Sequence, residues 1–185
     1  MTVPDTLRAL LLATQGLLRD KLSLDAARCS VRDDGMPPAK CGEYFYAIHG
    51  VAVLPGPTRH NRALDIEHHL RVTVTVRIGN TPADLWQKPA YLSVDTALQA
   101  RLWAVVAAMS KYRYTDGAGL GVLEAANTTL GDDHIIEPLE WVGSSGSPKV
   151  VGPEWFTAQS PDTSAGLVGS ADFRGGRAIV KLEDL

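Results

Sequence analysis

The sequence predicts an α+β fold: a mainly antiparallel sheet with a long β-hairpin packed against two or three helices, plus an extended C-terminal arm. Three patterns predict it. Over residues 64–78 apolar and polar side chains alternate, which is typical of a two-faced strand. Over residues 93–112 apolar side chains recur at three- and four-residue spacings, which indicates an amphipathic helix. Across residues 143–170 roughly half of the chain is Gly, Pro or Ser, which favours an extended segment.

The strand over residues 64–78 is unusually long. At ~3.3 Å per residue it spans roughly 50 Å, which exceeds the usual strand length in globular proteins. We therefore expect its Leu64 end to extend beyond a compact core and to need a neighbour. Its apolar side should pack under the helix formed around residues 98–109, and its polar side should face away from that helix.

The N-terminal residues predict a helix over about residues 3–19. Thr2 is a candidate N-cap, Pro4 fits the first turn, and leucines recur at helical spacing behind them. Residues 33–40 combine Asp, Gly and Pro, which predicts a surface loop.

A second strand is expected over residues 43–54, where aromatic and β-branched residues are frequent. Gly50 marks a bulge or a close backbone approach within it. This strand should pair with the strand over residues 64–78, and residues 55–62 should then form an exposed hairpin loop with a basic tip.

Weaker patterns follow. Residues 81–84 favour a short helix that Pro89 limits, and residues 122–128 favour another. Residues 134–142 predict a strand in which Pro138 requires an edge or a bulge.

The chain should end in a strand over residues 177–183, after a turn at Gly175 and Gly176. This order divides the chain into a core domain, an arm or insertion, and a C-terminal strand that returns to the core. The three parts span residues 1–142, 143–170 and 171–185.

The composition is that of a soluble globular protein, with 45% hydrophobic and 21% charged residues. The first residues lack the pattern of a secretory signal, and no apolar run reaches the ~20 residues of a membrane span, so we expect an intracellular protein. Cys29 and Cys41 lack a CxxC spacing and are expected to be free thiols, although a disulfide between them stays open. The acidic C-terminal third disfavours nonspecific nucleic-acid binding by that segment.

Histidine is the main candidate for catalysis. A small metal-dependent hydrolase that uses His49 and His68 stays open as an alternative, but its ligands would have to come from both faces of the sheet. His68 lies within an apolar face and is better explained as a hydrogen-bonded structural residue. The glycine-rich residues 115–121 and the serine-rich residues 143–147 match no phosphate loop and no nucleophile elbow.

Charged side chains instead suggest an interface between subunits. Ion pairs across such an interface would use the polar side of the long strand and the basic loop before it. The candidate residues are Asp65, Glu67, Arg71 and Arg77 on the strand, with Arg59 and Arg62 in the loop. A nucleic-acid-binding module is a further alternative, although no aromatic residues are interleaved with these arginines.

The order of elements resembles the tail terminator and related neck, or tail-completion, proteins of long-tailed bacteriophages. The resemblance lies in the leucine-rich first helix, the sequence EYFYAIHG after a Pro38–Gly42 turn, the sequence LRVTVTVRI followed by a capped helix, and the final GRAIVKLEDL. It rests on layout and not on a diagnostic motif.

The resemblance implies a structural virion protein with no catalysis and no cofactor. Such a protein caps the tail tube as a ring, expected as a homohexamer, and joins it to the head–tail connector, with the sheath as a further partner. DNA would be only passing cargo. The protein would lie in the virion neck, after assembly in the host cytoplasm and without a membrane.

Overall fold

A computed structural model of the chain describes residues 5–31, 43–57, 63–78, 98–109, 121–131, 134–144, 149–151 and 165–181. The elements are α1 (Thr6–Lys21), β1 (Cys29–Val31), β2 (Tyr44–Pro55), β3 (Ala63–Ile78), α4 (Gly121–Leu130), β4 (Leu139–Ser144), β5 (Lys149–Val151) and β6 (Ala165–Lys181). Residues 98–109 are also helical. The predicted α+β class with a long β-hairpin is therefore confirmed.

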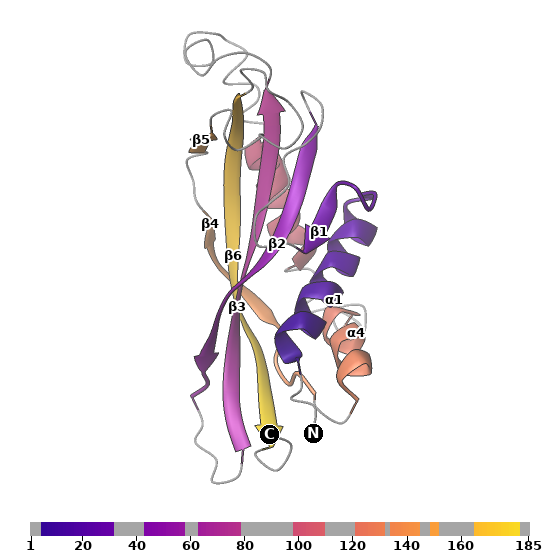
Figure 1. The fold of residues 1–185 in the computed structure, drawn as a ribbon, viewed down its shortest axis with the longest axis vertical. Helices are drawn as coiled ribbons and strands as arrows, with labels where there is room; N and C mark the ends of the chain where they lie inside the picture. Colours follow the sequence, from indigo (N-terminus) through magenta and orange to yellow (C-terminus); the bar gives the residue numbers. More distant parts are fainter. Residues whose placement is uncertain are drawn as a thin grey trace.

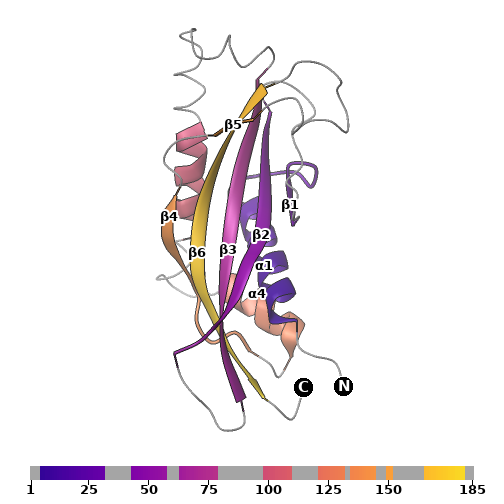
Figure 2. The same ribbon diagram turned by 60° about the vertical axis from the view of Figure 1, so that its left-hand side comes forward.

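The strands form one six-stranded sheet in the order β1-β2-β3-β6-β4, with β5 beside β6. Strand β1 is parallel to β2, and the other pairs are antiparallel. Figure 1 shows the three long strands, β2, β3 and β6, running along the molecule and twisting as they go, and Figure 2 shows the same sheet from the side. The lower ends of β3 and β6 reach beyond α1 and α4 in both views.

The core lies between one face of this sheet and the helices. Four apolar side chains of β3 are at most 2% exposed: Leu70, Val72, Val74 and Val76. They share one cluster with residues of α1, of helix 98–109 and of α4. The expectation that the apolar side of the long strand packs under helix 98–109 is thus confirmed.

Helix α1 begins later than expected. Its N-cap is Asp5, whose carboxylate accepts a hydrogen bond from the backbone N–H of Arg8 at 2.9 Å, so the proposed cap at Thr2 was wrong. At the other end Arg19 and Lys21 lie in the last turn, where positive charge stabilises the helix dipole.

Strand β2 pairs antiparallel with β3, as predicted. Both interpretations of Gly50 are confirmed. The register shifts between Gly50 and Ala52, and a side chain at Gly50 would lie 3.0 Å from a methyl group of Leu7. The glycine therefore lets α1 pack closely on the sheet.

Strand β6 differs most from the prediction. It starts at Ala165, inside the segment expected to be an arm, and β5 in the same segment pairs with it. The expected strand over residues 177–183 was therefore too short at its N-terminal end, and the boundary drawn after residue 170 falls inside β6. The first half of this strand was missed because it is rich in glycine and serine, which do not favour strands. One of these glycines lies close to the helix over residues 98–109, because a Cβ at Gly169 would lie 2.6 Å from a methyl group of Leu102.

Gly175 and Gly176 form a bulge and not the expected turn. Both have positive φ angles, 115° and 52°, and the register passes from His68↔Gly175 to Ile66↔Ala178 across them. The strand continues in the same direction on both sides of this bulge.

The remaining described elements agree in kind with the predictions. Strand β4 begins at Leu139, directly after Pro138, and lies at an edge of the sheet. The short helix expected over residues 122–128 is α4. The helix expected from residue 81 and the loop at 33–40 lie outside the described residues. In the part of the chain that is described, no helix is long and apolar enough to cross a membrane.

Candidate interaction surface

The sheet face opposite the helices has a row of ion pairs between β3 and β6. Arg71 holds Asp172 with two bonds, Nε to Oδ1 at 2.7 Å and Nη2 to Oδ2 at 3.1 Å. This hydrogen bonding raises the pKa of Arg71. Further along, Nε of Arg174 lies 3.2 Å from Oε1 of Glu67. These charges are neutralised within the chain.

Asp65 forms the most enclosed of these pairs. Its side chain is 1% exposed, and both of its oxygens accept hydrogen bonds from Arg177, at 2.8 and 2.7 Å. The same guanidinium donates to Glu137 at 2.9 Å. Hydrogen bonds to Asp65 and then to Glu137 raise the pKa of Arg177. Arg177 therefore connects β3 to the residues just before β4.

Three of the predicted interface residues thus contact β6 of the same chain. Asp65, Glu67 and Arg71 each form an ion pair within the chain. The sequence analysis identified these residues of β3 but not their partners on β6. The backbone of Arg77 pairs with Gly166, and Arg59 and Arg62 lie outside the described residues. Their role in a subunit interface stays a prediction.

The partners on β6 were missed because that strand was not recognised in full. A signal existed: Ala171 and Phe173 are apolar, and they alternate with Asp172 and Arg174. This period of two is typical of a strand with one buried face. In the structure Ala171 and Phe173 are indeed buried in the core.

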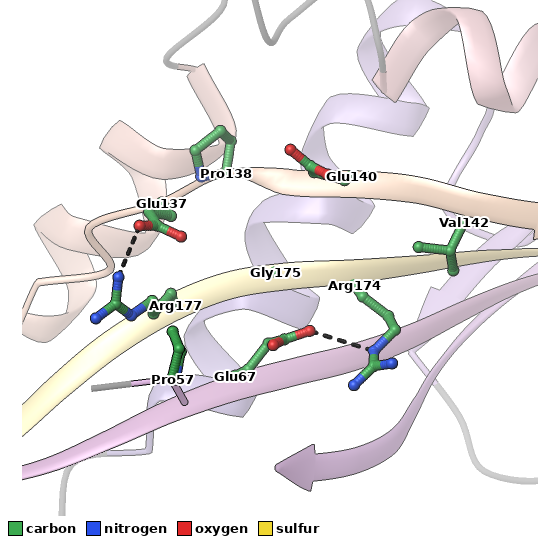
Figure 3. A pocket seen from close by; sticks show the side chains of 9 residues that line it. All are labelled: Pro57, Glu67, Glu137, Pro138, Glu140, Val142, Arg174, Gly175 and Arg177. Atoms are coloured by element: carbon green, nitrogen blue, oxygen red, sulfur yellow. Dashed lines mark hydrogen bonds and ion pairs between the residues drawn. The ribbon is translucent and has the colours of Figure 1, made fainter. Parts of the chain in front are cut away.

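A groove of about 570 Å³ lies on the same face, between β3 and β4. Figure 3 shows Glu67 and Arg174 on one side of it, and Glu137 and Arg177 near its other end. Gly175 lies between them on β6, where a Cβ would come within 2.5 Å of the carbonyl oxygen of Pro138. The remaining lining residues are Pro57, Pro138, Glu140 and Val142.

His68 lies on the other face, under α1, and is fully buried. Its Nδ1 donates to the carbonyl oxygen of Gly176 at 2.5 Å, so Nε2 accepts from the hydroxyl of Thr6 at 2.9 Å. Burial lowers the pKa of His68, and the hydrogen bond to Gly176 and the charges of Asp5 and Glu67 oppose this shift. The ring therefore joins the start of α1 to the bulge in β6, as the structural interpretation predicted.

The histidines do not form a common site. His49 pairs with Arg71 across β2 and β3, so it lies on the face opposite to that of His68. Among the described residues, no three His, Cys, Asp or Glu side chains could together hold a metal ion. On the polar face, Nε2 of His69 lies 3.9 Å from a carboxylate oxygen of Asp172.

The thiol of Cys29 and two of the aromatic side chains of β2 are enclosed. Cys29 is a free thiol and is buried, and burial raises its pKa to about 11, partly opposed by the charge of Arg19. Phe45 and Tyr46 are 5% and 1% exposed, so they provide no platform on which bases could stack. Tyr44 instead lies under the guanidinium of Arg101, 4.8 Å from its ring centroid.

No protein-family model matches this chain, and no curated protein matches it either.

Proposed function

We propose that this protein is a structural subunit of the phage neck, a tail terminator that caps the tail tube as a ring and joins it to the head–tail connector. The order of elements supports the proposal. A leucine-rich helix, a long antiparallel hairpin, further helices and a final strand follow one another as the resemblance to this family implies. The proposal includes no catalytic step.

The observation that carries the proposal is the exposed end of the long hairpin. Strand β1 pairs only with Tyr46–Ile48, and within the described residues no strand lies on the outer side of β2 beyond that point. The side chains of Val51 and Val53 are 44% and 49% exposed there, and Leu64 at the start of β3 is 46% exposed.

Such an edge favours association. Unpaired backbone groups beside exposed apolar side chains readily accept another strand or another apolar surface. Closed rotational symmetry would cover one such edge per subunit around a ring. The bulge at Gly50 and the proline at residue 55 limit the length that a partner strand could occupy.

The test combines the purified protein with purified phage particles. We expect light scattering and negative-stain imaging to show rings, and mass spectrometry to detect the protein in intact particles. Particles made without it should carry tails of irregular length or lack heads. A protein that is strictly monomeric and absent from particles would refute the proposal.

Two matched variants sharpen this test. Val53→Lys places a charge on the exposed edge and should reduce the number of joined particles by at least about tenfold if the edge is an interface. Leu12→Lys makes the same kind of change at a side chain of α1 that is 46% exposed, away from that edge, and should have little effect. Both variants should retain the melting temperature of the wild type to within a few degrees.

A further inference from the structure

Two exposed tryptophans, called here the tryptophan pair, lie at the β4 edge of the sheet. Trp103, on the helix over residues 98–109, is 60% exposed, and Trp141, on β4, is 42% exposed. Their ring centroids are 5.7 Å apart. Figure 2 shows this helix, in rose, beside β4. Ala100 and Ala107 are exposed on the same side of the helix as Trp103, so the apolar surface continues along it.

The area of the tryptophan pair is large enough to contribute to a stable interface. A tryptophan side chain presents up to about 250 Å², so the two rings together expose roughly 250 Å². A standard interface buries ~800 Å² per partner, and these two side chains would supply nearly a third of it. Tryptophan is also among the residues that contribute most to binding energy. We therefore expect a second apolar surface to cover this edge.

The opposite edge of the same sheet has such a surface at the same level. Counting across the paired strands, Val53 of β2 is level with Leu139 of β4. At this level β2 and β4 are the outermost strands among the described residues. Val53 pairs with His68 and Trp141 pairs with Phe173, and both of these partners are buried in the core. Val53 and Trp141 therefore lie on the same side of the sheet, the side that carries the helices.

The direction and the level of the two edge strands favour a second copy of this chain as the partner. Strand β4 runs opposite to β2, because three antiparallel pairings separate them. A copy rotated about an axis along the strands would thus bring its β2 antiparallel to β4, with no shift along that axis. A rotation without a shift closes a ring, whereas a rotation with a shift gives a helical filament.

We propose that the tryptophan pair of one subunit packs against Val51 and Val53 of the next subunit, with β4 and β2 side by side in a sheet that continues around the ring. This inference rests on the proposed ring and identifies its contact. Val53 then lies diagonally across from Trp141, at the ~7–8 Å over which aromatic side chains reach a cross-strand neighbour. Each subunit offers both parts of the contact, which is therefore heterologous.

A charge-swap experiment tests the contact. Val53→Lys and Trp141→Glu each place a charge in the apolar joint, and each variant alone should need an at least about tenfold higher concentration to form rings in light scattering. An equimolar mixture should restore rings, because in an alternating ring half of the joints are unchanged and the other half pair the lysine with the glutamate. Leu12→Glu, at a side chain of α1 that is 46% exposed, should form rings as readily as the wild type. Circular dichroism should show that every variant is folded.

Paired cysteines test the level of the two strands. Ala52 is level with Glu140, and directly opposed Cα atoms in antiparallel strands lie about 4.5–5.5 Å apart, which suits a disulfide. In a Cys41→Ser background, Ala52→Cys mixed with Glu140→Cys should form disulfide-linked dimers on oxidation. Ser144 lies roughly 10 Å further along the sheet, so Ser144→Cys should not cross-link with Ala52→Cys.

The outcomes distinguish the contact from the proposed function. Rings that persist in both charge variants, a mixture that stays dissociated, or cross-linking through Ser144→Cys instead of Glu140→Cys would overturn the contact while leaving the neck function intact. Rings that persist in a Trp141→Glu variant whose particles fail to join would show that the tryptophan pair binds a different protein, which also overturns it. A wild type that is a single chain at all concentrations would overturn it too, since no joint then forms. The neck function itself is judged separately, by the presence of the protein in particles.

Discussion

His68→Leu should cost about 2–6 kcal/mol of the free energy of unfolding. The leucine would keep the buried volume, but it would leave two polar groups without a partner, the hydroxyl of Thr6 and the carbonyl of Gly176. Thr6 is only 4% exposed, so water does not readily replace the imidazole there. Each unsatisfied buried group costs about 1–3 kcal/mol, which gives the total. Urea denaturation at pH 7.5 measures it.

A double-mutant cycle with Thr6→Val isolates the hydrogen bond to the helix. Alone, Thr6→Val should cost about 1–2 kcal/mol, because it leaves Nε2 of His68 unsatisfied. In the His68→Leu background the same change should be nearly neutral, since the hydroxyl that it removes has already lost its partner. Additive costs for the two changes would show that the bond contributes nothing.

The pH dependence provides a second test. Burial lowers the pKa of His68 below its usual 6.5, so below pH 6.5 the unfolded chain binds a proton that the native chain does not. Stability should therefore fall as pH falls through 6.5, by at most about 1.4 kcal/mol per pH unit for this group, and should level off below the native pKa.

His68→Gln should remove this contribution, while His134→Gln changes an exposed histidine and should not. Stability curves of wild type and His68→Gln that run parallel between pH 7.5 and 5 would refute the assignment of His68 as a buried neutral group.

Three further predictions concern other positions. Gly176→Ala should destabilise the protein by about 2–4 kcal/mol by urea denaturation, because its φ is positive and the new Cβ would collide with Leu10, whereas Gly143→Ala has open space and should change little. Gly16→Ala, with nothing within 4 Å of the new Cβ, should raise the stability of α1 by about 0.5–1 kcal/mol, and a lower melting temperature would contradict this. In a Cys41→Ser background Cys29, with its pKa raised to about 11, should not react with a thiol reagent at pH 8 until urea unfolds the chain; rapid reaction of the native protein would contradict its burial.

The local patterns of the sequence predicted the long hairpin well, and the reason is physical. Over residues 64–78 one face of the strand packs against the helices and the other does not, so apolar and polar residues alternate along the sequence. The helix over residues 98–109 was predicted for the same reason, since one of its faces packs in the core and its apolar residues therefore recur at helical spacing. The first half of strand β6 was not predicted, because Gly169, which lies close to Leu102, has no side chain that could mark the buried face.

The ion pairs of the polar face could not be predicted from either strand alone. Arg71 and Asp172 are 101 residues apart, and Asp65 and Arg177 are 112 apart. Nothing local to β3 indicates which distant charge lies beside it. The register that brings them together depends on the bulge at Gly175 and Gly176, which the sequence suggested only as a turn.

This internal pairing changes how a subunit interface has to be tested. Replacing Asp65 or Arg71 would break a contact between β3 and β6 within one subunit, so a loss of assembly would not separate a damaged fold from a damaged interface. Val53 is 49% exposed and lies on the part of β2 that β1 does not cover. An assembly defect at this position, in a variant that stays folded, would therefore report on contacts between subunits and not on the stability of one chain.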